Sequence, residues 1–303
     1  MVISSLASGY KRPDFENKRV LVRVDFNVPL NKDGTIADDT RIKAALPTIK
    51  LLCSYGAKVV LVSHLGRPHG VDPSLSLKVV AQRLSSLLDA QVAFAEDCIG
   101  PKAQSMVEKL EPGGVCLLEN VRFHAEEQRN DDEFSLQLAQ LADVYVNDAF
   151  GTAHRAHAST QGVTKYLRPA LAGLLMVKEI EALSSALENP ARPFLTIIGG
   201  AKVSTKLKVL ENLIQKVDSL AIVGAMAFTF LKARGLEVGK SLCEPDKLTF
   251  CQNLINAAVS RNVKLLLPAD VVIASEMKAG VPTAIVDVEH IPPDSTRLKL
   301  FNH

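Results

Sequence analysis

The chain has 303 residues, 47% of them hydrophobic, and a formal net charge of +2 at pH 7. This length fits two domains, and the composition is that of a globular protein and not of a disordered one. The near-zero charge argues against broad electrostatic attraction to nucleic acid or to a membrane surface, so any anion has to be bound by locally clustered basic residues.

Five cysteines are scattered along the chain without a Cys-x-x-Cys pair. This pattern favours reduced thiols inside a cell and argues against a disulfide framework or a zinc site. The first nine residues lack the basic and apolar regions of a secretory signal, and no uncharged apolar run reaches the roughly 18 residues that a membrane span needs. We therefore expect a cytoplasmic protein; a plastid form without its transit peptide would have the same features.

Short apolar runs alternate with helical patterns in the first half of the chain. The runs predict strands at residues 20–26, 58–62, 115–118 and 143–146. Between the first two runs, apolar residues recur at helical spacing: Ile42, Leu46, Ile49 and Leu52. Between the next two, the same spacing is shown by Leu77, Val80, Leu84 and Leu87. Strands that alternate with helices predict a parallel sheet.

The alternation stops at a long helical segment and then begins again. The helix is expected at about residues 171–187 and ends at Asn189-Pro190. Further strands are predicted at 194–198, 220–223 and 263–267, with weaker candidates at 271–274 and 284–288, and the end from residue 291 has no readable pattern. The expected fold class is α/β, with two doubly wound, Rossmann-like parallel-sheet domains, 1–170 and 191–303, joined by a helix at 171–190.

Basic residues follow each of the four predicted strands of the first half. Because ligands bind beyond the carboxyl ends of parallel strands, and because the guanidinium fork suits phosphate and carboxylate, these residues are candidates for one small-anion site: Arg41, His64, Arg67, Arg122 and Arg155. Asp25 and Asn27 share one face of the first strand. Each arginine alone could be a surface ion-pair partner, and His157 is expected to be structural, but the repetition at four strand ends predicts an anionic ligand.

Residues 198–206, Ile-Gly-Gly-Ala-Lys-Val-Ser-Thr-Lys, lie where a strand turns into a helix. The two glycines allow close backbone approach, the helix start offers free amide hydrogens to a phosphate, and two lysines add charge. A simple tight turn with a solvated helix face is the alternative. Residues 235–241 resemble the phosphate loop of nucleotide hydrolases, but they have three residues between the glycines where that motif has four, and they follow a helical stretch; this motif is therefore rejected.

Six segments, taken together and in order, resemble phosphoglycerate kinases: residues 22–29, 38–42, 63–68, 118–123, 147–157 and 199–203. The resemblance extends from the N-terminus to about residue 290. It implies reversible phosphoryl transfer between 1,3-bisphosphoglycerate with ADP and 3-phosphoglycerate with ATP, in glycolysis or carbon fixation, with Mg²⁺ as the cofactor. It also implies a monomer whose partners are 3-phosphoglycerate and ATP or ADP, without nucleic acid or membrane.

The resemblance assigns roles to individual residues. The phosphoglycerate would be held by Asp25, Asn27, Arg41, His64, Arg67, Arg122 and Arg155. The nucleotide would be bound by Gly200, Ala201, Lys202, Lys206 and Ala225. The catalytic residues would be Arg41, Lys202 and Lys206, and no residue is assigned as a metal ligand. The nucleophile is a carboxylate with a pKa of about 4, so catalysis needs positioning and charge neutralisation instead of a general base.

The second half departs from the family pattern. The family has three consecutive glycines where this chain has only Gly224, between Val223 and Ala225, so we expect a crowded adenine pocket. The chain has no Trp and ends at His303, and neither Asp287, in an expected strand, nor Asp294, after two prolines, has the setting of the family's magnesium ligand. We therefore expect the second domain to be incomplete.

Two functions remain open from the sequence. One is an active phosphoglycerate kinase, and the other is a truncated homologue that binds phosphoglycerate or a partner with little or no turnover. A nicotinamide dehydrogenase would need Gly-x-Gly-x-x-Gly after a strand, and the sequence does not contain this motif.

Overall fold

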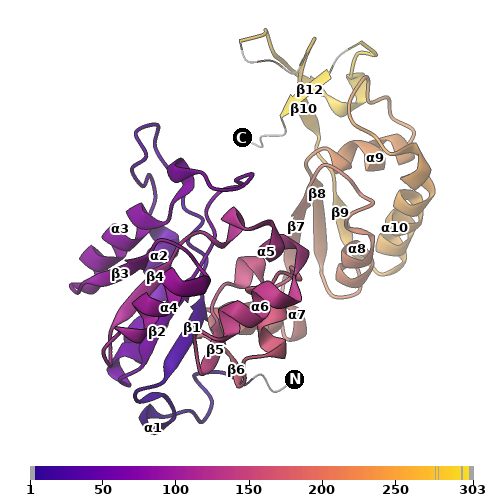
Figure 1. The fold of residues 1–303 in the computed structure, drawn as a ribbon. Helices are drawn as coiled ribbons and strands as arrows, with labels where there is room; N and C mark the ends of the chain where they lie inside the picture. The colour runs from indigo at the N-terminus through magenta and orange to yellow at the C-terminus, as the bar shows by residue number, and fades with distance from the viewer. Residues whose placement is uncertain (1–3, 277, 279, 295, 300–303) are drawn as a thin grey trace. The chain divides into compact units, whose positions relative to one another are not determined.

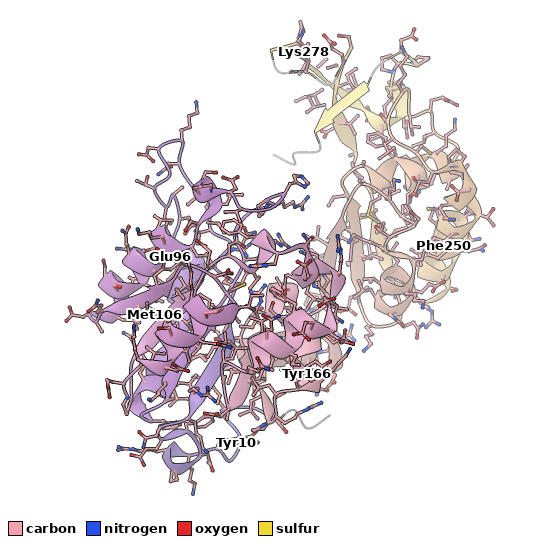
Figure 2. All side chains as sticks on the ribbon, in the orientation of Figure 1. Tyr10, Glu96, Met106, Tyr166, Phe250 and Lys278 are labelled. Atoms are coloured by element: carbon pink, nitrogen blue, oxygen red, sulfur yellow. The ribbon has the colours of Figure 1, made fainter. Side chains whose placement is uncertain are left out.

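The computed structural model describes residues 4–276, 278, 280–294 and 296–299. It divides into two compact units, Met1–Leu183 and Ser184–His303 (Figure 1). The division falls inside α7 (Leu174–Glu188). In each unit, helices pack against a sheet, and apolar side chains fill the space between the sheet and its helices. Figure 2 shows all described side chains on the ribbon.

The first unit contains a six-stranded sheet in the order β3-β4-β2-β1-β5-β6, in which every pair is parallel. Its strands are β1 (Arg19–Arg23), β2 (Lys58–Val62), β3 (Val92–Ala95), β4 (Val115–Leu118), β5 (Val144–Asn147) and β6 (Ala170–Ala172). The sequence predicted the four inner strands, and it missed β3 and β6, which are the two edges of the sheet. β6 has only three residues, whereas β3 is as long as β4; both edge strands are only partly buried, in contrast to the fully buried β4.

Both faces of this sheet are covered, which makes the unit doubly wound. Alternate residues of β1 point to opposite sides, so Val20 and Val22 join one core and Leu21 joins the other. The first core is closed by α2 (Thr40–Ser54) and α3 (Lys78–Leu88). The second is closed by α4 (Gly100–Glu108) and α6 (Asp132–Ala139). The shorter helices are α1 (Arg12–Phe15) and α5 (Ala125–Arg129). Burial on both faces explains the nearly continuous apolar runs of these strands.

The second unit has two small sheets. One is parallel, in the order β7-β8-β9, and the other is antiparallel, in the order β11-β10-β12. The strands are β7 (Leu195–Gly199), β8 (Ser219–Val223), β9 (Lys264–Leu266), β10 (Asp270–Ala274), β11 (Ala284–Asp287) and β12 (Thr296–Lys299). Its helices are α8 (Leu207–Leu213), α9 (Met226–Ala233) and α10 (Leu248–Ser260). The two weaker strand candidates are therefore strands, but they pair antiparallel with each other. Residues 235–241 follow α9 and not a strand, as the rejection of that motif requires.

The second unit has two hydrophobic cores, the larger between the parallel sheet and its helices and the smaller between α9 and the antiparallel sheet. Leu220 and Ile222 of β8 are fully buried against residues of α8, α9 and α10. On β7, Leu195 and Ile197 remain 50% and 64% exposed. In the part of the chain that the structure describes, no helix is long and apolar enough to cross a membrane.

Candidate active site

A cavity of about 290 Å³ lies at the carboxyl ends of the strands of the first unit. The structure brings all seven sequence-predicted phosphoglycerate residues around it: Asp25, Asn27, Arg41, His64, Arg67, Arg122 and Arg155. They come from the segments after β1, β2, β4 and β5 and from the first turn of α2. Side chains at four strand ends meet because parallel strands end at the same edge of a sheet. β1 ends at Arg23, three residues earlier than predicted, so the loop after it carries the acceptor groups.

A buried polar network supports the cavity from below. Arg23 is 1% exposed, and its Nε donates to Ser159 Oγ at 2.8 Å. Ser159 Oγ and its backbone amide in turn donate to the two carboxylate oxygens of Glu127, at 2.6 and 2.8 Å. His157 lies beside the same carboxylate, with 3.8 Å between Nδ1 and Oε1. A buried charge requires such partners. The network therefore holds the positively charged guanidinium of Arg23 next to His64, which lines the cavity.

His64 is a neutral hydrogen-bond donor at this site. Burial first, and then the charges of Arg23, Arg122 and Arg155, lower the pKa of His64 to about 2. An Nη nitrogen of Arg23 lies 3.1 Å from His64 Nδ1. Because guanidinium can only donate, Nδ1 accepts and the ring proton is on Nε2.

Arg122 is held in place but is not fully satisfied by the protein. Its side chain donates to the Gly66 carbonyl at 2.6 Å. Its buried Nε makes no hydrogen bond to any described residue. Burial first, and then the nearby Arg155 and Arg23, lower the pKa of its guanidinium. A buried donor without a partner is costly, and a bound oxyanion would relieve both the unmet hydrogen bond and the repulsion among the arginines.

Contacts within the protein also orient Asn27, Asp25 and Arg41. Asn27 Oδ1 accepts from the amide of Gly66 at 2.9 Å, and Gly66 has φ +63°, a conformation that favours glycine. Arg41 forms an ion pair with Asp25. Asn120, from the run after β4, donates to the carbonyl of Leu65 at 2.8 Å and fixes the loop after β2.

Sequence reasoning missed the supporting residues Arg23, Glu127 and Ser159 as parts of this site. Arg23 had one available signal, since the period of two in the predicted strand 20–26 puts it on the same face as Asp25. Glu127 and Ser159 had none, because Ser159 is 136 residues from Arg23. Asp148, in a run that matched the family, accepts from the amides of Leu175 and Met176 at 2.9 and 3.1 Å, at the start of α7, and so has a structural role.

The glycine–lysine loop of the second unit differs from its expected form. The sequence predicted free amide hydrogens at the helix start, but the amides of Val203 and Ser204 donate to Glu244 at 2.6 and 3.1 Å, and Ser204 Oγ donates to its other oxygen at 2.6 Å. These two amides precede α8, which begins at Leu207, so the expectation of free amides at the helix start itself stays a prediction. Lys202 is exposed and Lys206, half-buried, precedes α8.

Two turns of the second unit pack directly on each other. Gly224 has φ +77°, and a Cβ atom there would lie 2.7 Å from both N and O of Gly200. The amide of Met226 donates to the Gly200 carbonyl at 3.0 Å. Only glycine fits at position 224. Val223 Cγ2 lies 3.0 Å from the place that a Cβ of Gly199 would take, and Ala225 is half-buried at the start of α9. Of the predicted nucleotide residues, Gly200 makes this contact, and Ala225 adjoins it in the chain.

The described residues of the second unit do not include a cluster of three or more possible metal ligands. Both oxygens of Glu244 are engaged by the loop. Asp287 accepts from the Glu289 amide at 2.8 Å. Asp294 is 97% exposed and lies 3.6 Å from Lys240. Among the residues that the structure describes, three or more possible metal ligands converge only in the first unit, at Asp97, Cys98 and His124. A magnesium ion would therefore not be held by a ligand cluster of these residues.

The fold and the cavity define a class, the anion-binding α/β proteins with a cationic pocket at the end of a parallel sheet. Within this class, the chain belongs to the phosphoglycerate kinase family, because the family model "Phosphoglycerate kinase" matches residues 10–299.

Individual relatives agree with this assignment. The phosphoglycerate kinase of Thermosynechococcus vestitus is 58% identical over 281 residues, which cover 93% of this chain and 70% of that protein. The cytosolic phosphoglycerate kinase of Nicotiana tabacum is 53% identical over 292 residues, covering 96% of this chain and 73% of that protein. The phosphoglycerate kinase 1 of Arabidopsis thaliana, described as chloroplastic, is 53% identical over 298 residues, covering 95% of this chain and 62% of that protein.

Solved structures show the same fold. The phosphoglycerate kinase of Coxiella burnetii is 41% identical with a TM-score of 0.77, and the match covers 98% of this chain and 74% of that one. That of Pyrococcus horikoshii is 33% identical with a TM-score of 0.74, covering 96% of this chain and 72% of that one.

Proposed function

We propose that this chain binds 3-phosphoglycerate in the cavity of the first unit and transfers a phosphoryl group reversibly between its carboxylate and a nucleotide. The observation that carries the proposal is the convergence of four arginines on one small cavity. The single carboxylate among its lining residues, Asp25, is already paired with Arg41. The excess of positive charge matches a ligand that carries both a phosphate and a carboxylate.

Each group of the cavity has a chemical task in this proposal. Arg67, Arg122 and Arg155 bind the phosphate, and the free Nε of Arg122 supplies one of the donors. Asp25 and Asn27 accept from the hydroxyl of the glycerate. His64 donates from Nε2 without adding charge, because burial keeps its pKa low. The orientation of the ligand then leaves its carboxylate free to act as the nucleophile, and this group needs no general base.

Arg41 is the residue we assign to the phosphoryl group in transfer. It lies in the first turn of α2, and its side chain is 51% exposed beyond its ion pair with Asp25. A cation placed where negative charge develops lowers the barrier to phosphoryl transfer. Arg41 is therefore expected to affect turnover more than ground-state binding.

The nucleotide is assigned to the loop of the second unit. Gly200 and Ala201 offer main chain, Lys202 and Lys206 offer charge, and Ala225 lies at the adjoining turn. The family uses magnesium nucleotide, in which the metal neutralises phosphate charge. Since the described residues do not form a ligand cluster for it, we derive no step from the metal here. We further propose a monomeric protein of the cytoplasm, the placement given in the name of the Nicotiana tabacum relative. The plastid is the alternative, because the Arabidopsis thaliana relative is described as chloroplastic.

A second function, phosphoglycerate binding with little turnover, is favoured by one specific feature. The amides of Val203 and Ser204, at the loop that should receive the nucleotide phosphates, donate to Glu244. Amides that already donate to Glu244 are not available to a phosphate, and Val223 and Ala225 are expected to crowd the adenine pocket. Both features predict weak nucleotide binding.

A coupled turnover assay separates the two functions. The purified chain is given 3-phosphoglycerate and magnesium ATP, and nucleotide binding is measured in parallel by calorimetry. Turnover of roughly 1–10³ per second with micromolar nucleotide affinity establishes the kinase. Phosphoglycerate binding without turnover establishes the binding function, and the absence of both removes the proposal.

A further inference from the structure

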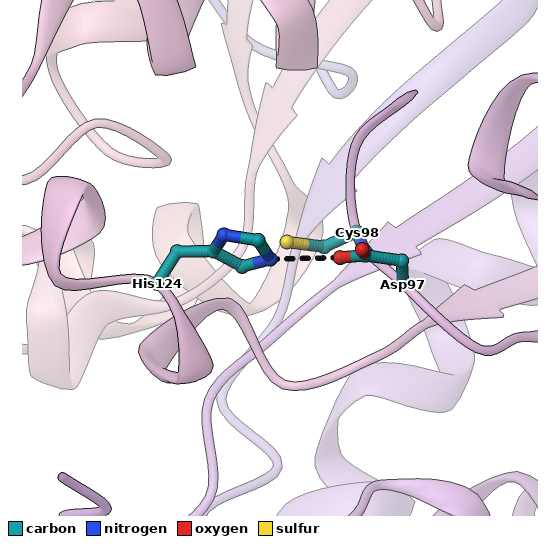
Figure 3. A group of neighbouring side chains, drawn as sticks. All are labelled: Asp97, Cys98 and His124. Carbon is teal, nitrogen blue, oxygen red and sulfur yellow. Dashed lines mark hydrogen bonds and ion pairs between the residues drawn. The ribbon is translucent and has the colours of Figure 1, made fainter. Parts of the chain in front are cut away.

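A cluster of three possible metal ligands lies outside the cavity described above. Asp97 and Cys98 follow β3, and His124 follows β4 (Figure 3). The two strands pair in parallel and end together at Ala95 and Leu118, which brings the two loops to the same edge of the sheet. One ligand atom from each residue lies within 4.8 Å of the other two.

We propose that Asp97, Cys98 and His124 bind a divalent cation of the zinc class, with a water molecule as the fourth ligand. A thiolate, an imidazole and a carboxylate together form a ligand set that zinc accepts. Magnesium prefers oxygen ligands, so this ion is distinct from the metal that accompanies a nucleotide. The sequence argued against a zinc site because its cysteines are unpaired, but these ligands come from two loops and need no Cys-x-x-Cys spacing.

The geometry needs only a small adjustment to hold the ion. Tetrahedral zinc ligands lie about 3.5 Å apart, given metal–ligand distances of about 2.0–2.3 Å. His124 Nε2 and Asp97 Oδ1 are 2.8 Å apart, so an ion would enter between them and replace this hydrogen bond. The ring proton of the histidine would then be on Nδ1. Binding replaces the thiol proton of Cys98 by the metal, and that proton leaves to solvent.

The surroundings fix the ligands and leave a path for the ion. Cys98 is fully buried, and its own amide donates to Asp97 Oδ1 at 2.7 Å. The ring of His124 packs against Phe134, with 5.3 Å between the ring centroids. The side chains of Asp97 and His124 are 39% and 29% exposed, so solvent reaches the cluster.

Cobalt is a spectroscopic probe for such a site. The reduced, metal-free full-length chain is titrated with Co²⁺ in an excess of Mg²⁺, and thiolate-to-cobalt charge-transfer absorption is recorded. We expect one Co²⁺ per chain with thiolate absorption, displacement by Zn²⁺, and a higher thermal midpoint with either metal. The Cys98→Ser variant should lose the absorption. Asp97→Asn and His124→Gln should keep it but weaken Co²⁺ binding by at least about tenfold.

Matched controls share residue types but not position. Cys53→Ser, a half-buried cysteine of α2, and His69→Gln, an exposed histidine, should both behave as the unchanged chain. Because the side chain of Asp97 is partly exposed, Asp97→Asn is expected to fold. If Cys98→Ser does not fold, the Co²⁺ affinity of Asp97→Asn tests the site instead. No thiolate absorption with Co²⁺, or absorption that survives in Cys98→Ser, would overturn the site and leave Asp97 and His124 as a hydrogen-bonded pair that joins two loops.

Discussion

The two candidate ligand sites of this chain are built in different ways. In the first unit, side chains form the site, and a buried network through Arg23, Ser159 and Glu127 holds them. In the second unit, main chain forms the site, and two of its amides already donate to Glu244. The difference teaches that a cluster of charged side chains is organised before its anion arrives, whereas a loop of amides can be satisfied by a carboxylate of its own chain.

Removal of Arg23 should have the largest effect on the first site. Arg23→Met leaves Ser159 and His64 without their buried donor, and breaking such a network costs about 3–5 kcal/mol in the free energy of unfolding. Urea unfolding measures this loss. The control is Arg19→Met at the start of the same strand, where a half-exposed ion pair with Asp143 is worth about 1 kcal/mol or less. Equal losses in the two variants would show that the network does not hold the site.

Arg41→Ala tests whether the first site has a separate catalytic charge. We expect turnover to fall by roughly a hundredfold, or about 3 kcal/mol, with a smaller change in phosphoglycerate affinity. Steady-state kinetics separate kcat from KM. Arg83→Ala is the control, because Arg83 pairs with the neighbouring surface residue Asp39 at 2.6 Å and does not line the cavity. Unchanged kcat in Arg41→Ala would remove the catalytic assignment.

Gly224→Ala tests the main-chain site of the second unit. The variant combines a left-handed backbone with a Cβ 2.7 Å from Gly200 N and O. The two turns must therefore separate, at a cost of about 2–3 kcal/mol in the free energy of unfolding. Nucleotide affinity should fall as well, because the same turns are assigned to the nucleotide. Gly235→Ala is matched in conformation, with φ +88° but no atom within 4 Å, and should cost only about 1 kcal/mol of strain. If thermal unfolding shows that Gly224→Ala and Gly235→Ala lose the same amount of stability, the close contact with Gly200 does not contribute to the cost of the substitution.

The pH dependence of stability sharpens the account of His64. Its pKa is about 2 in the folded protein against about 6.5 in an unfolded chain, so the unfolded state binds more protons between these values. Stability should therefore be complete above pH 6.5 and fall as the pH decreases, by at most about 1.4 kcal/mol per pH unit from this residue. His157, whose pKa is also lowered, mainly by burial, acts in the same direction.

Variants assign this pH dependence to a residue. His64→Gln should reduce the loss between pH 7 and pH 5.5 by about 1 kcal/mol, as measured by urea unfolding at each pH. His69→Gln, at an exposed position, should not change it. An identical slope in His64→Gln and the unchanged chain would mean that His64 is not held neutral.

The sequence predicted the parts of the fold that depend on local pattern. The bounds of β2 and β4 agree with the prediction, because these inner strands are apolar on both faces. The edge strands β3 and β6 were missed; β6 has only three residues, and β3, although as long as β4, is only partly buried. The five basic residues of the cavity could be predicted from their positions, since the ends of parallel strands meet, whereas the roles of Asp25 and Asn27 were implied by the family resemblance. Their functional roles stay predictions until the variants are measured.

The missed side-chain contacts all join segments that are distant in sequence. Glu127 reaches Ser159 across 32 residues, and Glu244 reaches Ser204 across 40. His124 meets Asp97 across 27. No periodicity or motif reports such contacts, because they depend on how loops from different strands pack.

Equilibrium titration of 3-phosphoglycerate tests most directly the claim that the first unit contains the phosphoglycerate site. Calorimetry is done on the unchanged chain, on Arg155→Ala at an exposed cavity position, and on Lys202→Ala in the loop of the second unit. The account predicts binding by the unchanged chain, a loss of at least about tenfold in Arg155→Ala, as expected for one charge-assisted hydrogen bond, and no change in Lys202→Ala. No binding by the folded, unchanged chain at millimolar ligand, or an equal loss in the two variants, would contradict it.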